Sequence, residues 1–84
     1  MNNSVKNHCI LNDTWLSGCI SRLAFQGASE QQTILLISQW ELAALKYASW
    51  LETEGFTIQE AVGIVDLALV KADFDLGKFP VCLA

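Results

Sequence analysis

The chain has 84 residues, of which 52% are hydrophobic and 17% are charged, whereas about 25% are charged in an average globular domain. This length predicts a single domain over residues 1–84, with a core that is small for so hydrophobic a composition. The net charge is −4 and the five Lys and Arg residues are scattered, which argues against direct nucleic-acid binding because the phosphate backbone requires clustered cations.

The first element is a polar start that ends in the hydrophobic triplet Cys9-Ile10-Leu11. This triplet is compatible with an edge strand or with a loop that packs onto the core. The start MNNSVKNHC lacks a charged region followed by a hydrophobic one, so we expect no signal peptide. The three cysteines Cys9, Cys19 and Cys82 are odd in number and lack the spacing of paired metal ligands. We therefore expect a cytoplasmic protein without disulfides, metal or cofactor.

Three amphipathic helices follow, at about residues 14–25, 30–54 and 58–72. Their ends are marked by the candidate N-caps Asn12, Asp13 and Thr14, the capping boxes Ser29–Gln32 and Thr57–Glu60, and the glycines Gly27 and Gly55. β-Branched residues in the third helix leave a strand over 64–70 as an alternative. The pattern predicts an all-α fold, a small three-helix domain with an extended C-terminal tail. A short strand pairing between the termini stays open.

The two longer helices each carry a second hydrophobic stripe beside the one that a core requires. A three-helix domain of this length can bury one stripe per helix. The second stripes therefore predict either a central helix covered on both sides or an interface with another chain, and we favour the interface. Trp50 lies at the margin of the core face and could anchor that interface, because Trp is enriched at binding hot spots. The predicted interface residues are Leu35, Leu42, Leu45, Trp50, Leu67, Val70 and Phe74.

Acidic side chains of the two longer helices and the segment after them could steer the protein to a basic surface on a partner. The residues concerned are Glu41, Glu52, Glu54, Asp66, Asp73 and Asp75. The last three do not form a calcium-binding loop, since the spacing and the terminal Glu of such a loop are missing. A membrane span over 33–51 is excluded because Glu41 and Lys46 would lie near the bilayer centre.

No catalytic motif and no convergent set of polar residues stands out in the sequence, so we expect a protein that is not an enzyme. Our interpretation is a cytoplasmic, homodimeric regulator or inhibitor that acts by docking on a partner protein. Compact acidic proteins of this kind occur among phage-encoded inhibitors of host machinery, which is an analogy of class alone. The alternative is a structural or assembly subunit that is stable only within an oligomeric complex.

Overall fold

The structure is a computed structural model, and it describes residues 10–80. Within these residues the elements are α1 (Asp13–Phe25), α2 (Glu30–Thr53), α3 (Ile58–Ala72) and the short 3-10 helix η2 (Leu76–Lys78). The predicted three-helix, all-α fold is confirmed, and residues 64–70 are helical throughout. The β-branched side chains of α3 are accommodated because tertiary packing outweighs their mild helix penalty.

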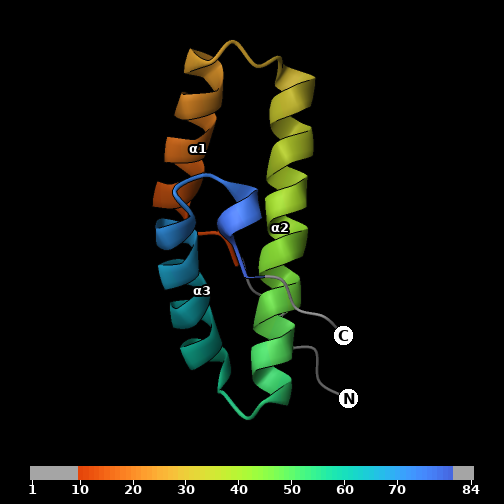
Figure 1. Cartoon of the computed structure of the whole chain (residues 1–84), viewed down its shortest axis with the longest axis vertical. Coiled ribbons are helices and arrows are strands. Elements are labelled where there is room, and N and C mark those ends of the chain that lie inside the picture. The colour runs from red at the N-terminus through yellow and green to blue at the C-terminus, as the bar shows by residue number, and fades with distance from the viewer. Residues whose placement is uncertain (1–9, 81–84) are drawn as a thin grey trace.

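The helix α2 runs the full length of the molecule, with α1 beside its N-terminal part and α3 beside its C-terminal part (Figure 1). Both shorter helices are antiparallel to α2, so the end of α3 lies beside the start of α1. Asn12 marks this junction, since its side-chain amide donates to the Asp66 carboxylate at 3.3 Å. The described part measures 41 × 23 × 23 Å, and the 24 residues of α2 account for about 36 Å of its length.

The helices start where their capping residues predict. Among the three candidates for α1, Asn12 is the N-cap, and its side-chain oxygen accepts from the backbone N–H of Trp15 at 2.7 Å. Both capping boxes form in full, at Ser29 for α2 and at Thr57 for α3. In each box the N-cap hydroxyl accepts from the backbone N–H three residues on, and the side chain of that third residue accepts from the N-cap backbone N–H. The box therefore satisfies two amides that a helix start otherwise leaves unpaired.

The first two helices end at glycine, as predicted. Gly27 and Gly55 have φ angles of 84° and 105°, a left-handed conformation that glycine adopts without steric cost. After Gly27 the backbone N–H of Ala28 donates to the carbonyl of Leu23 at 3.0 Å, the hydrogen bond of a Schellman cap. These two glycines allow the chain to reverse direction in two tight connections between helices.

The main helix–helix contact joins α2 to α3, and small side chains are prominent among the buried residues of both helices. Ala44 and Ala48 of α2 are completely buried, as are Ala61 and Ala72 of α3. Small residues let the two backbones approach closely, but they also bury little hydrophobic surface per residue. The aromatic residues must therefore supply much of the remaining core.

An aromatic series extends through the centre of the molecule. Its members, in order of contact, are Phe74, Trp15, Trp40, Phe79, Tyr47 and Trp50, with ring centroids 5.0–6.2 Å apart. All neighbouring pairs are offset-stacked or edge-to-face, the arrangements that aromatic quadrupoles favour. Trp15 comes from α1, three of the rings come from α2, and Phe74 and Phe79 come from the segment after α3. This series joins α1 and α2 to the segment that follows α3.

The C-terminal segment differs from the predicted extended tail. Residues 76–78 form the 3-10 helix η2, because the Asp75 side chain accepts from the backbone N–H of Gly77 at 3.0 Å and closes a tight turn. Phe79 then packs into the core. Ile10 and Leu11 are also buried, but residues 10–80 contain no strand, so the part of the predicted terminal pairing that falls on them does not form. Cys9 and residues 81–84 lie outside the described residues.

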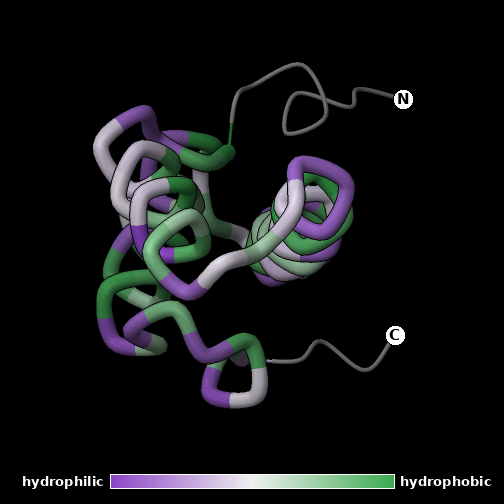
Figure 2. The backbone as a smooth tube through the Cα atoms, turned by 90° about the horizontal axis from the view of Figure 1, so that it is seen from above, coloured by the Kyte–Doolittle hydropathy of each residue, from purple (hydrophilic) through white to green (hydrophobic). Residues whose placement is uncertain are grey.

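Seen along the long axis, α2 forms one column of the molecule and the other elements form a second (Figure 2). The outer side of α2 faces away from α1 and α3. At Leu42 it borders a hollow that Leu76, Phe79 and Pro80 also line, so the segment after α3 reaches this part of α2. None of the helices in the described range has the length and hydrophobicity that crossing a membrane requires.

Candidate protein-binding surfaces

The predicted second stripe of α2 is open to solvent at two of its three leucines. Leu35 is 60% exposed and Leu42 is similarly exposed, with Ile34 exposed beside them. Leu45 differs, because it is half-buried and packs against the core. Leu45 lies only about 60° around the helix from the buried Ala48, which places it at the edge of the core face.

The predicted stripe of α3 is also divided. Leu67 and Val70 are exposed, but Phe74 is half-buried and stacks on Trp15. The helical spacing that placed Phe74 on this stripe ends at Ala72, because the next two residues adopt left-handed backbone angles. That turn directs Phe74 toward α1, where its ring closely approaches Gly18.

The open parts of the two stripes lie on opposite sides of the molecule. Leu35 precedes the buried Ala44 by nine residues, and Val70 follows the buried Ala61 by nine, which is half a turn around a helix in both cases. The buried alanines mark the side of each helix that faces the core, and α2 and α3 form the main helix–helix contact of that core, so each stripe points away from it. One flat interface cannot contain both stripes.

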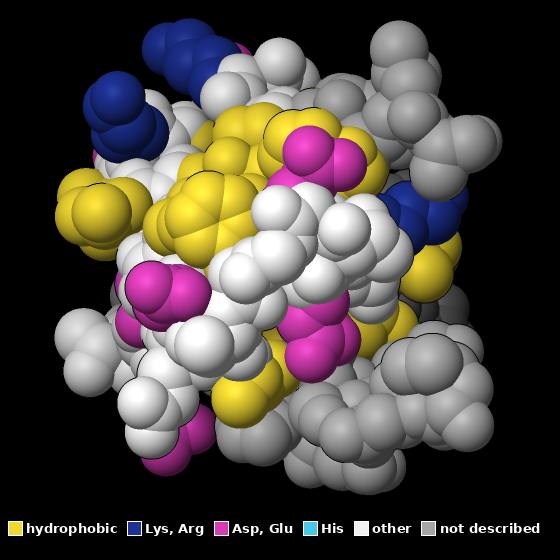
Figure 3. Space-filling model, turned by 90° about the horizontal axis from the view of Figure 1, so that it is seen from below, with side chains coloured by type: hydrophobic (Ala, Val, Ile, Leu, Met, Phe, Trp, Pro, Cys, Tyr) yellow, Lys and Arg dark blue, Asp and Glu magenta, His cyan; other side chains and the backbone are white. Residues whose placement is uncertain are grey.

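Trp50 is 41% exposed, and it stacks on Tyr47 with a centroid separation of 6.2 Å. It lies near the C-terminal end of α2, as does the exposed Phe56 of the following connection. The end view of the molecule shows hydrophobic side chains here with Asp and Glu side chains around them (Figure 3). This end is therefore both apolar and acidic.

The six predicted steering residues are spread along the molecule and do not form one acidic patch. Glu41 lies in the middle of α2, and Glu52 and Glu54 lie at its C-terminal end. The three aspartates have partners within the fold. Asp66 accepts from Asn12, Asp73 lies 3.5 Å from the Arg22 guanidinium, and Asp75 caps η2. Because these acidic residues are spread out, they give the protein a diffuse negative electrostatic field and not a single charged binding site.

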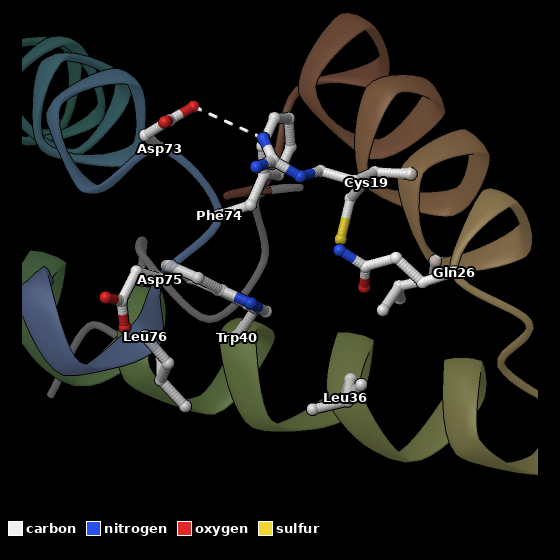
Figure 4. A pocket seen from close by; sticks show the side chains of 10 residues that line it. Cys19, Gln26, Leu36, Trp40, Asp73, Phe74, Asp75 and Leu76 are labelled. Carbon is white, nitrogen blue, oxygen red and sulfur yellow. Dashed lines mark hydrogen bonds and ion pairs between the residues drawn. The ribbon is translucent and has the colours of Figure 1, made fainter.

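A cavity of about 300 Å³ lies between α1, α2 and the turn from α3 into η2 (Figure 4). Sequence reasoning missed it, since its walls come from three separate segments. Its apolar walls include Leu23, Leu36 and Trp40, and the turn into η2 adds Phe74 and Leu76. Arg22 crosses one side, with its guanidinium 5.2 Å from the centre of the Phe74 ring.

Two further features of this cavity concern its chemistry. Cys19 lies in the wall, and burial raises the pKa of its thiol above the usual value, which keeps the thiol protonated at neutral pH. Asp73 and Phe74 have φ angles of 49° and 63°, a conformation that is uncommon for Asp and a clear outlier for Phe. Strained backbone of this kind is concentrated at functional sites, so the cavity is a candidate binding site.

A second, shallower hollow of about 440 Å³ lies at the end of the molecule where α1 connects to α2. Leu35 borders it, and Phe25, the last residue of α1, is 94% exposed at the same end. Sequence reasoning assigned no role to Phe25. The sequence does carry one signal for this end, because residues 20–40 contain only Arg22 and Glu30 as charged residues.

The described residues contain no group of three or more His, Cys, Asp or Glu side chains that could hold a metal ion. His8, Cys9 and Cys82 lie outside the described range. The chain matches no protein-family model, no curated protein and no solved structure.

Proposed function

We propose that this protein has no catalytic activity of its own and acts by binding another protein through the end formed by α1 and α2. The observation that carries the proposal is the exposure of Phe25, Ile34 and Leu35 at an end almost without charge. Interface centres are depleted in charged residues, and isolated domains rarely leave so many large apolar side chains together in water.

The rest of the molecule supplies a negative field. Residues 41–75 contain seven Asp and Glu against two Lys, a net charge of 2 − 7 = −5. This field would accelerate encounter with a basic partner and orient the nearly uncharged end at its surface. A regulator or inhibitor in the cytoplasm that masks a site on its partner, as phage-encoded inhibitors do, fits this division of roles.

A benzophenone crosslinker at the apolar end tests this proposal directly. The photoreactive amino acid is placed at position 25 or 35, and the protein is irradiated in cells of its native host. Gln59, exposed on α3, provides the control position. We expect one defined protein adduct from positions 25 and 35 and none from position 59, as read by mass spectrometry. Equal or absent crosslinking at all three positions contradicts the proposal.

The same experiment separates the predicted homodimer from a different partner, because an adduct of two copies of this chain identifies the homodimer. Leu42→Glu is a second test of self-association: light scattering should show loss of the dimer if the outer side of α2 is the contact. An unchanged mass and an unchanged stability exclude that contact.

A second candidate is an assembly subunit that is stable only within a complex. It is favoured by the core, because the completely buried residues of α2 and α3 are mostly alanines. A cooperative thermal transition of the isolated protein, with sharp near-ultraviolet dichroism, contradicts this candidate, whereas a broad transition supports it.

A further inference from the structure

The cavity and the shallow hollow are parts of one depression. Both are lined by Leu23, Gln26 and Leu36, so the depression continues along the crevice between α1 and α2. It runs from the turn before η2 to the connection between α1 and α2. The exposed Leu35 borders its outer end, which joins it to the apolar surface of the proposed function.

The inner end of the depression carries charge. Arg22, Asp73 and Asp75 are its charged residues. The guanidinium of Arg22 lies 3.5 Å from the Asp73 carboxylate and over the Phe74 ring, so its charge is already compensated within the fold. The carboxylate of Asp75 is turned to the backbone N–H of Gly77 and lacks a cationic partner among residues 10–80. The inner end is therefore negative, and the middle and outer end are uncharged, lined by leucines together with the amide side chains of Gln26 and Gln32.

From this arrangement we infer that the depression receives an amphipathic, basic segment of the partner protein, an inference that rests on the proposed function. The hydrophobic side chains of the segment fill the two hollows along Leu23 and Leu36. A Lys or Arg of the segment lies against the Asp75 carboxylate, while Asp73 beside it balances the charge of Arg22. An acidic segment of the same shape would meet carboxylates at the inner end and a chain of net charge −4 on approach.

Two model peptides test the charge and the place of binding. One is a blocked amphipathic peptide of Leu and Lys, about 18 residues long and so roughly 27 Å as a helix. The other has Glu at every Lys position. Nitrogen-15 spectra of the protein resolve the indole N–H signals, of which Trp40 lies in the cavity and Trp50 lies ten residues further along α2.

We expect the Lys peptide to shift the Trp40 indole signal in a saturable manner while the Trp50 signal stays in place. The Glu peptide should cause no such shift. Equal shifts with both peptides, or a shift confined to Trp50, overturn the inference. This readout uses the unaltered protein, so it does not depend on whether any variant folds.

Charge variants separate specific contact from general attraction to an acidic protein. In D73N/D75N the new amide oxygens can still accept hydrogen bonds, and Asn tolerates the left-handed angle at position 73. The matched control E52Q/E54Q removes the same charge at the other end of α2. We expect D73N/D75N to weaken binding of the Lys peptide about three- to tenfold, and the control to weaken this binding less than about twofold. Equal weakening by both variants overturns the inference.

Failure here and failure of the proposed function are distinguishable. If crosslinking from position 25 captures a partner protein but the Lys peptide does not shift Trp40, the assigned chemistry of the occupant is wrong and the binding function stands. If neither experiment succeeds, both proposals fail.

Discussion

Replacing Phe79 by Ala tests whether the segment after α3 is an integral part of the core. Phe79 is only 3% exposed, and its ring lies edge-to-face against Trp40 at 5.6 Å and against Tyr47 at 5.7 Å. An aromatic side chain of this kind buries at least about 150 Å², which at 25 cal/mol per Å² corresponds to about 4 kcal/mol. Measured costs of Phe→Ala in cores, about 3–5 kcal/mol, agree with this magnitude.

The total stability of an 84-residue domain is about 4–13 kcal/mol, so the variant should be severely weakened or unfolded. Urea denaturation monitored by Trp fluorescence measures the change, since Trp40 touches the altered side chain. Phe79→Leu keeps most of the volume and should cost about 1.5 kcal/mol, which remains measurable if the Ala variant does not fold.

Phe25→Ala is the matched control, because it removes the same atoms from a side chain that is 94% exposed. It should change the free energy of unfolding by less than about 0.5 kcal/mol. The reasoning is refuted if Phe79→Ala costs less than about 1 kcal/mol at an unchanged denaturant slope, since the aromatic series would then be dispensable.

Three further predictions concern caps, backbone strain and the buried thiol. Ser29→Ala and Thr57→Ala should each lower the free energy of unfolding by about 1 kcal/mol. The two costs should add in the double variant, because the caps serve different helices. A double variant that is as stable as one of the single variants contradicts this. Asp73→Gly should be more stable than Asp73→Ala by about 1 kcal/mol, as measured by urea denaturation, because only glycine accepts a φ of 49° without cost; equal stabilities would show that the backbone there is unstrained. Burial raises the pKa of the Cys19 thiol above 9.0, so alkylation mapped by peptide mass spectrometry at pH 8 should be much slower at Cys19 in the folded protein than in urea. Because the thiol ionises at lower pH in the unfolded chain than in the folded protein, it makes its full contribution to the free energy of unfolding below pH 9. That contribution is lost as the pH rises through the pKa of the folded protein.

Local sequence signals determined the helices and their ends. Ser29 and Thr57 opened capping boxes, and Gly27 and Gly55 supplied the left-handed residues that end α1 and α2. These signals act within a few residues of chain, so they can be read without knowing the tertiary structure. The face of α2 that holds Trp40 and Ala44 was likewise predictable from helical periodicity.

The candidate binding surfaces were predictable only in part. Leu35, Leu42, Leu67 and Val70 are exposed as their spacing indicated. Periodicity gives each helix its own faces, however, and does not say how two helices are rotated relative to each other. For that reason the sequence could not show that the two stripes point in opposite directions.

What the tertiary structure alone decided is the course of the chain after Ala72. The left-handed angles at Asp73 and Phe74 turn the chain back on itself, so that Phe74 reaches Trp15 and Phe79 reaches Trp40. Nothing in the local sequence favours that conformation at a Phe, and it persists because the aromatic contacts on both sides outweigh its strain. The sequence by itself determined three helices and their hydrophobic faces. The long-range contacts determined the cavity between them, because its walls come from segments that only the fold brings together.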